Sequence, residues 1–303
     1  MTIIRGRYIS LAESLERRSR LEQHLQELGV QERYSWFPAV RGDPETATER
    51  GLRPGEWGLW QSWLQLLKEE LTHTQSSYNW LHIVEDDAEL SGHFLVFCNH
   101  LREGPPTFDL VFTDMYVNPS IHRSFAEEHQ RLQTRGQIQL KTDVYTGCAS
   151  SVLIHRQRIP MVLSRLQECL SGSRSLLPLD NQLLRLFHDK QLKFARTAPF
   201  ITGVQRNSIS ESTIQQRNQD QRSVVVTQQI CANLRRQLSM LETNNPANEL
   251  IHLMHTLAKE CDKPSQEDLT RTITLQLMHL AEQKNLLRYG VQPRLKGEPN
   301  NPQ

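Results

Sequence analysis

This chain of 303 residues has few cysteines and few aromatic residues, which make up 7% of it. It also has almost no excess of charge of either sign. Its five cysteines are odd in number, widely separated and without a CxxC pair, so neither a disulfide framework nor a zinc knuckle is predicted. A reducing, cytoplasmic setting fits best. With 35 basic and 34 acidic side chains, the net charge of +1 gives no global field that would attract nucleic acid, and we expect no nucleic-acid partner.

Long apolar runs are also missing. No segment approaches the ~20 apolar residues that a membrane span requires, and the apolar stretch after Tyr8 is too short for a signal peptide. Hydrophobic residues still make up 37% of the chain, which is enough for one large core, or for one core with an appendage. The composition therefore predicts a soluble globular protein.

Strands and helices are predicted to alternate along the first two thirds of the chain, which indicates an α/β layered domain. Two stretches predict loops: 41–54 is rich in charge, Gly and Pro, and 116–136 is polar, irregular and a candidate acceptor-binding flap. Apolar runs predict the strands, and apolar residues at helical spacing predict the helices. Strands are expected at 8–11, 34–40, 81–84, 108–113 and 192–198, and helices at 14–28, 55–71 and 158–170.

The composition changes after about Ser212, where Gln, Asn and Arg become frequent and strand-like runs nearly vanish. We expect a first domain over 1–212, a helical C-terminal region over 213–289 and a disordered tail over 290–303. The helical spacing covers 224–241, 246–261 and 265–289, which would pack on the first domain or form an oligomer contact. His252 and His255 lie one helical turn apart without further ligands, which favours an ordinary helix surface.

The run Leu81 to Asp87 delivers three consecutive carboxylates to the end of a buried strand. Hard oxygen ligands crowded at such a position suit Mg²⁺ or Mn²⁺, which can bridge carboxylates to the phosphates of a nucleotide. The alternative is that Asp86 or Asp87 caps a helix or stabilises a turn, because short acids often do so. The run alone favours neither interpretation.

Taken in order, the motifs of the first two thirds resemble glycosyltransferase family 25, which contains lipooligosaccharide galactosyltransferases and procollagen galactosyltransferases. The acidic run matches the Glu-Asp-Asp signature of that family, and a loose match lies at Ser208 to Ser210. Trp63 departs from the pattern, since the family usually has His there. The other matching segments are Tyr8 to Leu11 with Glu16 to Arg18, Phe37 to Gly42, Pro54 to Trp63, Tyr145 to Ile154 and Pro178 to Asp180.

The resemblance implies a GT-A-like nucleotide-sugar-binding fold and an inverting transfer of a hexose, such as galactose, from a UDP-sugar. The acceptor would be a lipopolysaccharide-like glycan or a protein, and peripheral association with the inner face of a membrane is compatible with that acceptor. Asp86 and Asp87 would hold Mn²⁺ or Mg²⁺, and Glu85 would contact the donor. Arg17 would reach the donor phosphate, Glu56 would organise the donor site, and Asp180 would act as the general base.

Each of these roles has a structural alternative. Arg17 can belong to a solvated helix face, Glu56 can interact with a helix dipole, and Asp180 can cap a helix. Trp57, Trp60 and Trp63 can form a sugar-stacking platform, although an aromatic stripe on a helix is usually core. Two functional alternatives also stand: a catalytically inactive binding or assembly protein, and, more weakly, a nuclease or phosphatase.

Overall fold

The computed structural model describes residues 4–72, 78–101, 107–117, 119–172, 175–205, 231–232, 234–236 and 238–239. The chain divides into two units, Met1–Thr243 and Asn244–Gln303, and every described residue belongs to the first. His252, His255, Ser208 to Ser210 and the predicted tail lie outside the described residues. The boundary expected at residue 212 stays a prediction.

The strands are short and apolar, as the sequence runs predict. Their residues are buried almost throughout β1, β3, β7 and β8, which have neighbours on both edges and both faces. The strands are β1 (Ile4–Ser10), β2 (Tyr34–Pro38), β3 (Trp80–Glu85), β4 (Ala88–Leu90), β5 (Leu110–Phe112), β6 (Gln139–Lys141), β7 (Ser151–His155), β8 (Phe194–Ala198) and β9 (Thr202–Val204).

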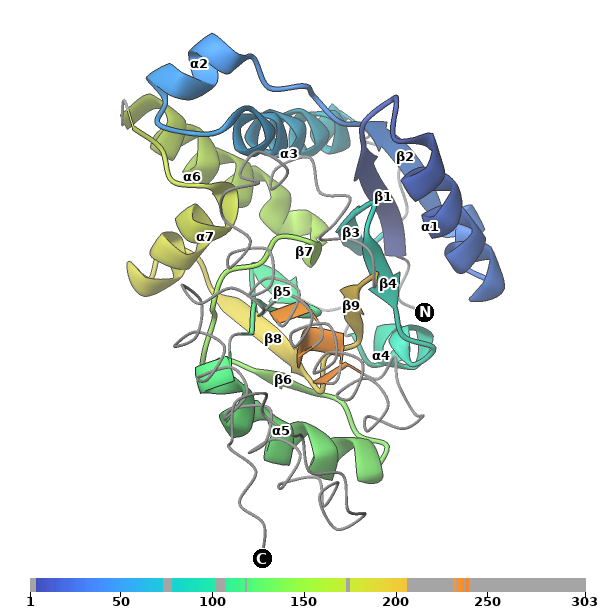
Figure 1. Ribbon diagram of the computed structural model, residues 1–303. Coiled ribbons are helices and arrows are strands. Elements are labelled where there is room, and N and C mark those ends of the chain that lie inside the picture. Colours follow the sequence, from blue (N-terminus) through green and yellow to red (C-terminus); the bar gives the residue numbers. More distant parts are fainter. Residues whose placement is uncertain are drawn as a thin grey trace, which may run out of the picture. The chain divides into compact units, whose positions relative to one another are not determined.

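A mixed seven-stranded sheet forms the centre of this unit, in the order β2-β1-β3-β7-β5-β8-β6 (Figure 1). Strand β1 runs parallel to β2 and β3, and β5 runs parallel to β8. Strand β7 is antiparallel to both β3 and β5, and β6 is antiparallel to β8. A second sheet pairs β4 with β9. The α/β fold class predicted from the sequence is confirmed.

Helices cover both faces of the sheet. In β1, Arg7 reaches Glu70 of α3 while the adjacent Tyr8 reaches Glu22 of α1, so these two helices lie on opposite faces. One core joins α1 and α4 to the sheet through Val84, Val111 and their neighbours. The helices are α1 (Leu15–Glu27), α2 (Pro44–Glu49), α3 (Pro54–Thr72), α4 (Phe94–His100), α5 (Pro119–Thr134), α6 (Ile159–Gly172) and α7 (Leu179–His188), with 3₁₀ turns η1 (Gln31–Arg33) and η2 (Arg156–Arg158).

Both predicted loops contain a helix, so those two predictions are wrong in part. Helix α2 begins after Asp43, whose side chain accepts a hydrogen bond from the Thr46 amide at 2.8 Å. Helix α5 replaces the expected flap, because Phe125 and Leu132 are buried on one face of an otherwise polar helix. None of the helices in the described part of the chain is long and apolar enough to cross a membrane.

The segment Tyr145 to Ile154, which resembles a later strand of family 25, is extended only within β7. The preceding residues form a loop in which Gly147 has a φ of 80°, a conformation that glycine adopts without strain. This loop approaches the start of α7: a Cβ atom on Gly147 would lie 3.7 Å from the Asp180 carbonyl oxygen. The loop before β7 therefore lies next to the start of α7, which carries Asp180.

Candidate functional site

The carboxyl ends of β1, β3 and β5 meet at one edge of the sheet. Strand β7 is antiparallel to its neighbours β3 and β5, so the loop before β7 reaches the same edge. In open α/β sheets, ligands bind outside the carboxyl ends of the strands. This edge is therefore where the sheet topology places a binding site.

The acidic run lies at this edge, as predicted. Glu85 is the last residue of β3, and Asp86 and Asp87 form the turn that leads into β4. The backbone of the turn is held on both sides: the Glu85 amide donates to the Ser150 carbonyl, and the Asp87 carbonyl accepts from the Gln205 amide, both at 2.8 Å. The backbone that carries the three carboxylates is thus held by the residues that adjoin β7 and β9.

Arg17 of α1 joins two of these carboxylates. Its Nη2 lies 2.5 Å from Asp86 Oδ1 and 3.2 Å from Asp87 Oδ2. The Ser10 hydroxyl, at the end of β1, donates to Asp86 Oδ2 at 2.7 Å. Asp86 and Asp87 therefore converge on one positive group, which is the arrangement that a cation site requires.

Negative charge is only partly compensated here. Burial, together with the charges of Asp87 and Asp86, raises the pKa of Glu85 to about 8, although Arg17 opposes this shift. Burial also raises the pKa of Asp86 against the effects of Arg17 and Ser10. Asp87 Oδ1 is buried and has no hydrogen-bond partner among the described residues. The cluster can therefore accept more positive charge than Arg17 supplies.

A cavity of about 520 Å³ opens beside the acidic run. Its walls are the segment after β1, the segment after β2, and the first turns of α3, and Arg17, Arg41 and Arg53 contribute to its lining. At the mouth, Arg41 pairs with Glu13 of the opposite wall. A pocket of this size, with carboxylates and guanidinium groups together, suits a ligand that carries both phosphate and hydroxyl groups.

Two glycines shape the wall of this cavity. A Cβ atom on Gly42 would lie 1.8 Å from the Pro54 carbonyl oxygen, and one on Gly58 would lie 2.5 Å from the Val40 carbonyl oxygen. The segment after β2 and the start of α3 therefore approach more closely than other residues would permit. Ser62 completes this contact, because its hydroxyl accepts from the Val40 amide at 2.9 Å.

The residues present fit a divalent cation with few protein ligands. Mg²⁺ and Mn²⁺ are commonly held by one or two carboxylates, with water and substrate phosphate completing the coordination. Asp86 and Asp87 supply two such carboxylates. In the part of the chain that the structure describes, no cluster of three His, Cys, Asp or Glu side chains forms a complete metal site. A cation here would depend on a bound ligand.

The other predicted site residues lie close by. Asp180 is the second residue of α7, and burial raises the pKa of its carboxyl, with a further contribution from the charge of Glu56. The charge of Asp180 in turn contributes to the raised pKa of Glu85. Neither Asp180 nor Glu56 lines the cavity. Their proposed functional roles stay predictions.

Two of the structural alternatives are evident in α3. Glu56 Oε2 accepts a hydrogen bond from the Arg53 amide at 2.7 Å, which is a helix-capping contact. Trp57, Trp60 and Trp63 are all buried, so they form part of the core and no sugar-stacking platform. Trp63, at the position where the family that the sequence resembles usually has His, has an exposed fraction of 0%.

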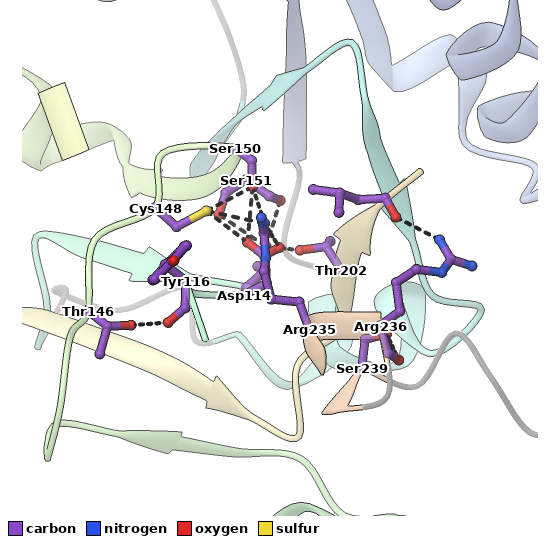
Figure 2. Close-up of polar contacts among 12 residues, drawn as sticks. Asp114, Tyr116, Thr146, Cys148, Ser150, Ser151, Thr202, Arg235, Arg236 and Ser239 are labelled. Atoms are coloured by element: carbon purple, nitrogen blue, oxygen red, sulfur yellow. Dashed lines mark hydrogen bonds and ion pairs between the residues drawn. The ribbon is translucent and has the colours of Figure 1, made fainter. Parts of the chain in front are cut away.

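The sequence interpretation missed a second polar cluster at the same edge, made by Asp114, Cys148, Ser150 and Arg235 (Figure 2). Asp114 follows β5 just as Asp86 follows β3, so an acid at a strand end was the available signal. Nothing in the local sequence marks Arg235 as its partner, because 121 positions separate the two residues.

Comparisons with known proteins found similar folds among solved structures and no match elsewhere. No family model matches the chain, and no curated protein matches it. One similar structure is a mutant of Drosophila beta-1,4-galactosyltransferase 7 in complex with manganese, UDP-Gal and xylobiose; its TM-score is 0.36 and its identity 10%, over 73% of this chain and 79% of that chain.

A second similar structure is a glycosyltransferase involved in the glycosylation of the major capsid of PBCV-1. Its TM-score is 0.36 and its identity 7%, over 64% of this chain and 80% of that chain. Similarity at this level identifies neither the activity nor the substrate of this chain. The function is therefore argued from the site itself.

Proposed function

We propose that this chain is a GT-A-like, nucleotide-sugar-dependent glycosyltransferase of the family 25 type. The observation that carries this proposal is the convergence of Asp86 and Asp87 on one positive group beside a cavity of about 520 Å³, at the carboxyl end of β3. The cavity would take the nucleoside diphosphate, and UDP-galactose is the first donor to test.

Charge compensation would govern cleavage of the donor. Negative charge develops on the leaving diphosphate as the bond from the anomeric carbon to phosphate breaks. A divalent ion held by Asp86 and Asp87 would supply Lewis-acid stabilisation of that charge. Arg17, which pairs with both carboxylates, would also donate a hydrogen bond to a phosphate oxygen, and Glu85 would accept a hydrogen bond from a donor hydroxyl.

Asp180 is the proposed general base. In an inverting transfer, the acceptor oxygen attacks the anomeric carbon on the face opposite the diphosphate, and its proton passes to a carboxylate. Burial raises the pKa of Asp180, which makes its carboxylate a better proton acceptor than an exposed aspartate. The acceptor itself would be a lipopolysaccharide-like glycan or a protein hydroxyl group.

The test is a calorimetric titration of UDP into the full-length protein, with and without Mn²⁺. We expect binding that requires Mn²⁺ and that becomes at least a hundredfold weaker in Asp87→Asn. The matched control is Asp189→Asn, which removes an exposed carboxylate after α7. Failure of the wild-type protein to bind UDP in the presence of Mn²⁺ would contradict the proposal.

A catalytically inactive binding protein is the second candidate. The ion pairs of Arg17 favour it, since a guanidinium group already compensates the two carboxylates that a metal would need. In that case UDP would bind equally well with Mn²⁺ or EDTA, and no donor sugar would be transferred or hydrolysed.

A further inference from the structure

Residues far beyond β9 are built into the same unit as the central sheet. Leu234, Leu238 and Ser239 are buried, and Ser239 forms a β-bridge with Phe200 (orange in Figure 1). His129 of α5 contacts the Leu238 carbonyl at 2.9 Å through its Nδ1 atom. The segment 231–239 is thus attached to the sheet on one side and to α5 on the other.

This segment inserts Arg235 into the polar cluster at the carboxyl edge (Figure 2). Arg235 Nη2 pairs with Asp114 Oδ2, donates to Ser150 Oγ at 2.9 Å and lies 3.2 Å from Cys148 Sγ. Ser150 in turn donates to Asp114 Oδ1 at 3.1 Å. Asp114 is fully buried, so Arg235 is the cation that compensates its charge.

Ser150 connects this buried pair with the acidic run. Its side chain is held by Asp114 and Arg235, while its carbonyl accepts the hydrogen bond of the Glu85 amide at 2.8 Å. The other end of the loop is also fixed, because the Gly147 carbonyl accepts from the Tyr116 amide at 3.3 Å. Only one residue, Ser150, separates the guanidinium group from the backbone that orients the three carboxylates.

Arg235 also contributes positive charge to this edge. Burial alone would lower the pKa of its guanidinium group, but the charge of Asp114, its hydrogen bond to Asp114 and the charge of Asp87 raise that pKa above its ordinary value. The side chain therefore stays charged, and Asp87 lies within its electrostatic range. Five carboxyl groups at this edge, those of Glu85, Asp86, Asp87, Asp114 and Asp180, are opposed by the guanidinium groups of Arg17 and Arg235.

We propose that Arg235 is a positioning residue for the acidic run, so that a working donor site requires the described residues around it, 234–236 and 238–239. This inference rests on the proposed function for its catalytic meaning. The Arg235–Asp114 pair fixes Ser150, Ser150 fixes the Glu85 amide, and the turn that carries Asp86 and Asp87 follows directly.

The test removes the pair without leaving an unpaired charge, by means of the double variant Asp114→Asn/Arg235→Met in the full-length chain. We expect the Glu85 amide to exchange with deuterium at least tenfold faster, as measured by mass spectrometry of peptides that span β3 and its turn. We also expect Mn²⁺-dependent UDP affinity to fall at least tenfold. The single variant Arg235→Lys should keep part of the exchange protection and part of the UDP affinity, since lysine retains the charge and a hydrogen-bond donor.

The matched control is Arg165→Met, which removes an exposed, ion-paired arginine from α6 and should change neither quantity. Should the double variant lose its circular dichroism signal, Ser150→Ala serves instead, because it cuts the side-chain link and leaves the ion pair intact. Ser150→Ala should speed exchange of the Glu85 amide severalfold.

Unchanged exchange at Glu85 in the folded variants would overturn the proposal and leave the pair as core packing. The exchange measurement does not depend on UDP, so it decides the positioning role even if the wild-type protein binds no nucleotide. Absence of UDP binding with faster exchange would contradict the proposed function alone.

Discussion

Two charged clusters lie toward opposite ends of the neighbouring strands β1 and β3, and they differ in how fully basic groups compensate the acidic ones. Near the amino ends, Arg5 and Arg7 pair with Glu70 at 3.2 and 2.7 Å, and Arg7 Nη2 pairs with Glu69 at 2.8 Å. Tyr78 donates to the remaining oxygen of Glu70 at 2.9 Å. Two basic groups thus meet two acids.

At the carboxyl ends, Asp86 and Asp87 of the three consecutive acids pair with Arg17 beside an open cavity, and one oxygen of Asp87 has no partner among the described residues. A balanced cluster around the buried Glu70 carboxylate needs no ligand to compensate its charge and stabilises the fold. An unbalanced cluster on a cavity is compensated fully only when a ligand or cation arrives. Within one sheet, the comparison therefore distinguishes a cluster that its own counter-ions compensate from one that we propose binds a ligand.

The largest expected effect tests the functional end. Asp180→Asn should lower the rate of sugar transfer about a thousandfold, since the amide cannot accept the acceptor proton. UDP affinity should stay within a few-fold of wild type because Asp180 does not line the cavity. Steady-state kinetics with a confirmed donor and acceptor would measure both, and an unchanged kcat would exclude Asp180 as the base.

A smaller effect tests the structural end. Glu70→Gln removes the buried carboxylate that Arg5 and Arg7 share, and we expect the free energy of unfolding to fall by about 3 kcal/mol in urea denaturation. Asp87→Asn is the matched acid-to-amide change at the other end, and it should cost far less stability because it also relieves repulsion from neighbouring carboxylates. Equal losses from the two substitutions would break the comparison.

The smallest effect concerns His82, which lies in β3 between the two clusters. Burial lowers the pKa of His82 to about 3, and its ring nitrogens contact Tyr34 OH and Ser151 Oγ at 2.7 and 2.8 Å. An unfolded histidine binds its proton near pH 6.5, so the unfolded state holds the extra proton between about pH 6.5 and 3. Stability should therefore fall as the pH falls through this window.

His82→Gln keeps hydrogen-bonding groups in this position and removes the titration. The slope of unfolding free energy against pH should become smaller by up to about 1.4 kcal/mol per pH unit between pH 6 and 4. Urea denaturation at several pH values measures this slope. An identical slope in the wild-type protein and the variant would mean that His82 is already protonated when folded.

Local sequence patterns predicted the helices and strands in which neighbouring residues all favour the same secondary structure. The apolar run before Glu85 identified β3 and the turn of carboxylates after it, and the Pro54 to Trp63 segment identified the start of α3. Helix α5 was missed because its buried apolar residues, Phe125 and Leu132, are outnumbered by polar ones, which include the buried His122 and His129. Strands β4 and β9 are three residues long and depend on each other, so neither carries a pattern of its own.

The site was predictable only where its residues are neighbours in sequence. The acidic run is contiguous, and Arg17 follows the first strand closely. The ion pair of Asp114 with Arg235 depends on tertiary packing of residues 121 positions apart, and the periodicity of the sequence does not predict it. Sequence reasoning therefore found the carboxylates of the site and missed part of the framework that holds them.

The long separation of Asp114 and Arg235 has a consequence for how the protein is made. At a synthesis rate of about 5–20 residues per second, Arg235 leaves the ribosome on the order of 10 s after Asp114. Strand β5, which lies just before Asp114, is therefore synthesised before this counter-ion exists. Until Arg235 arrives, the Asp114 carboxylate keeps its charge only while it is hydrated, so burial of this edge is coupled to synthesis of the chain as far as Arg235.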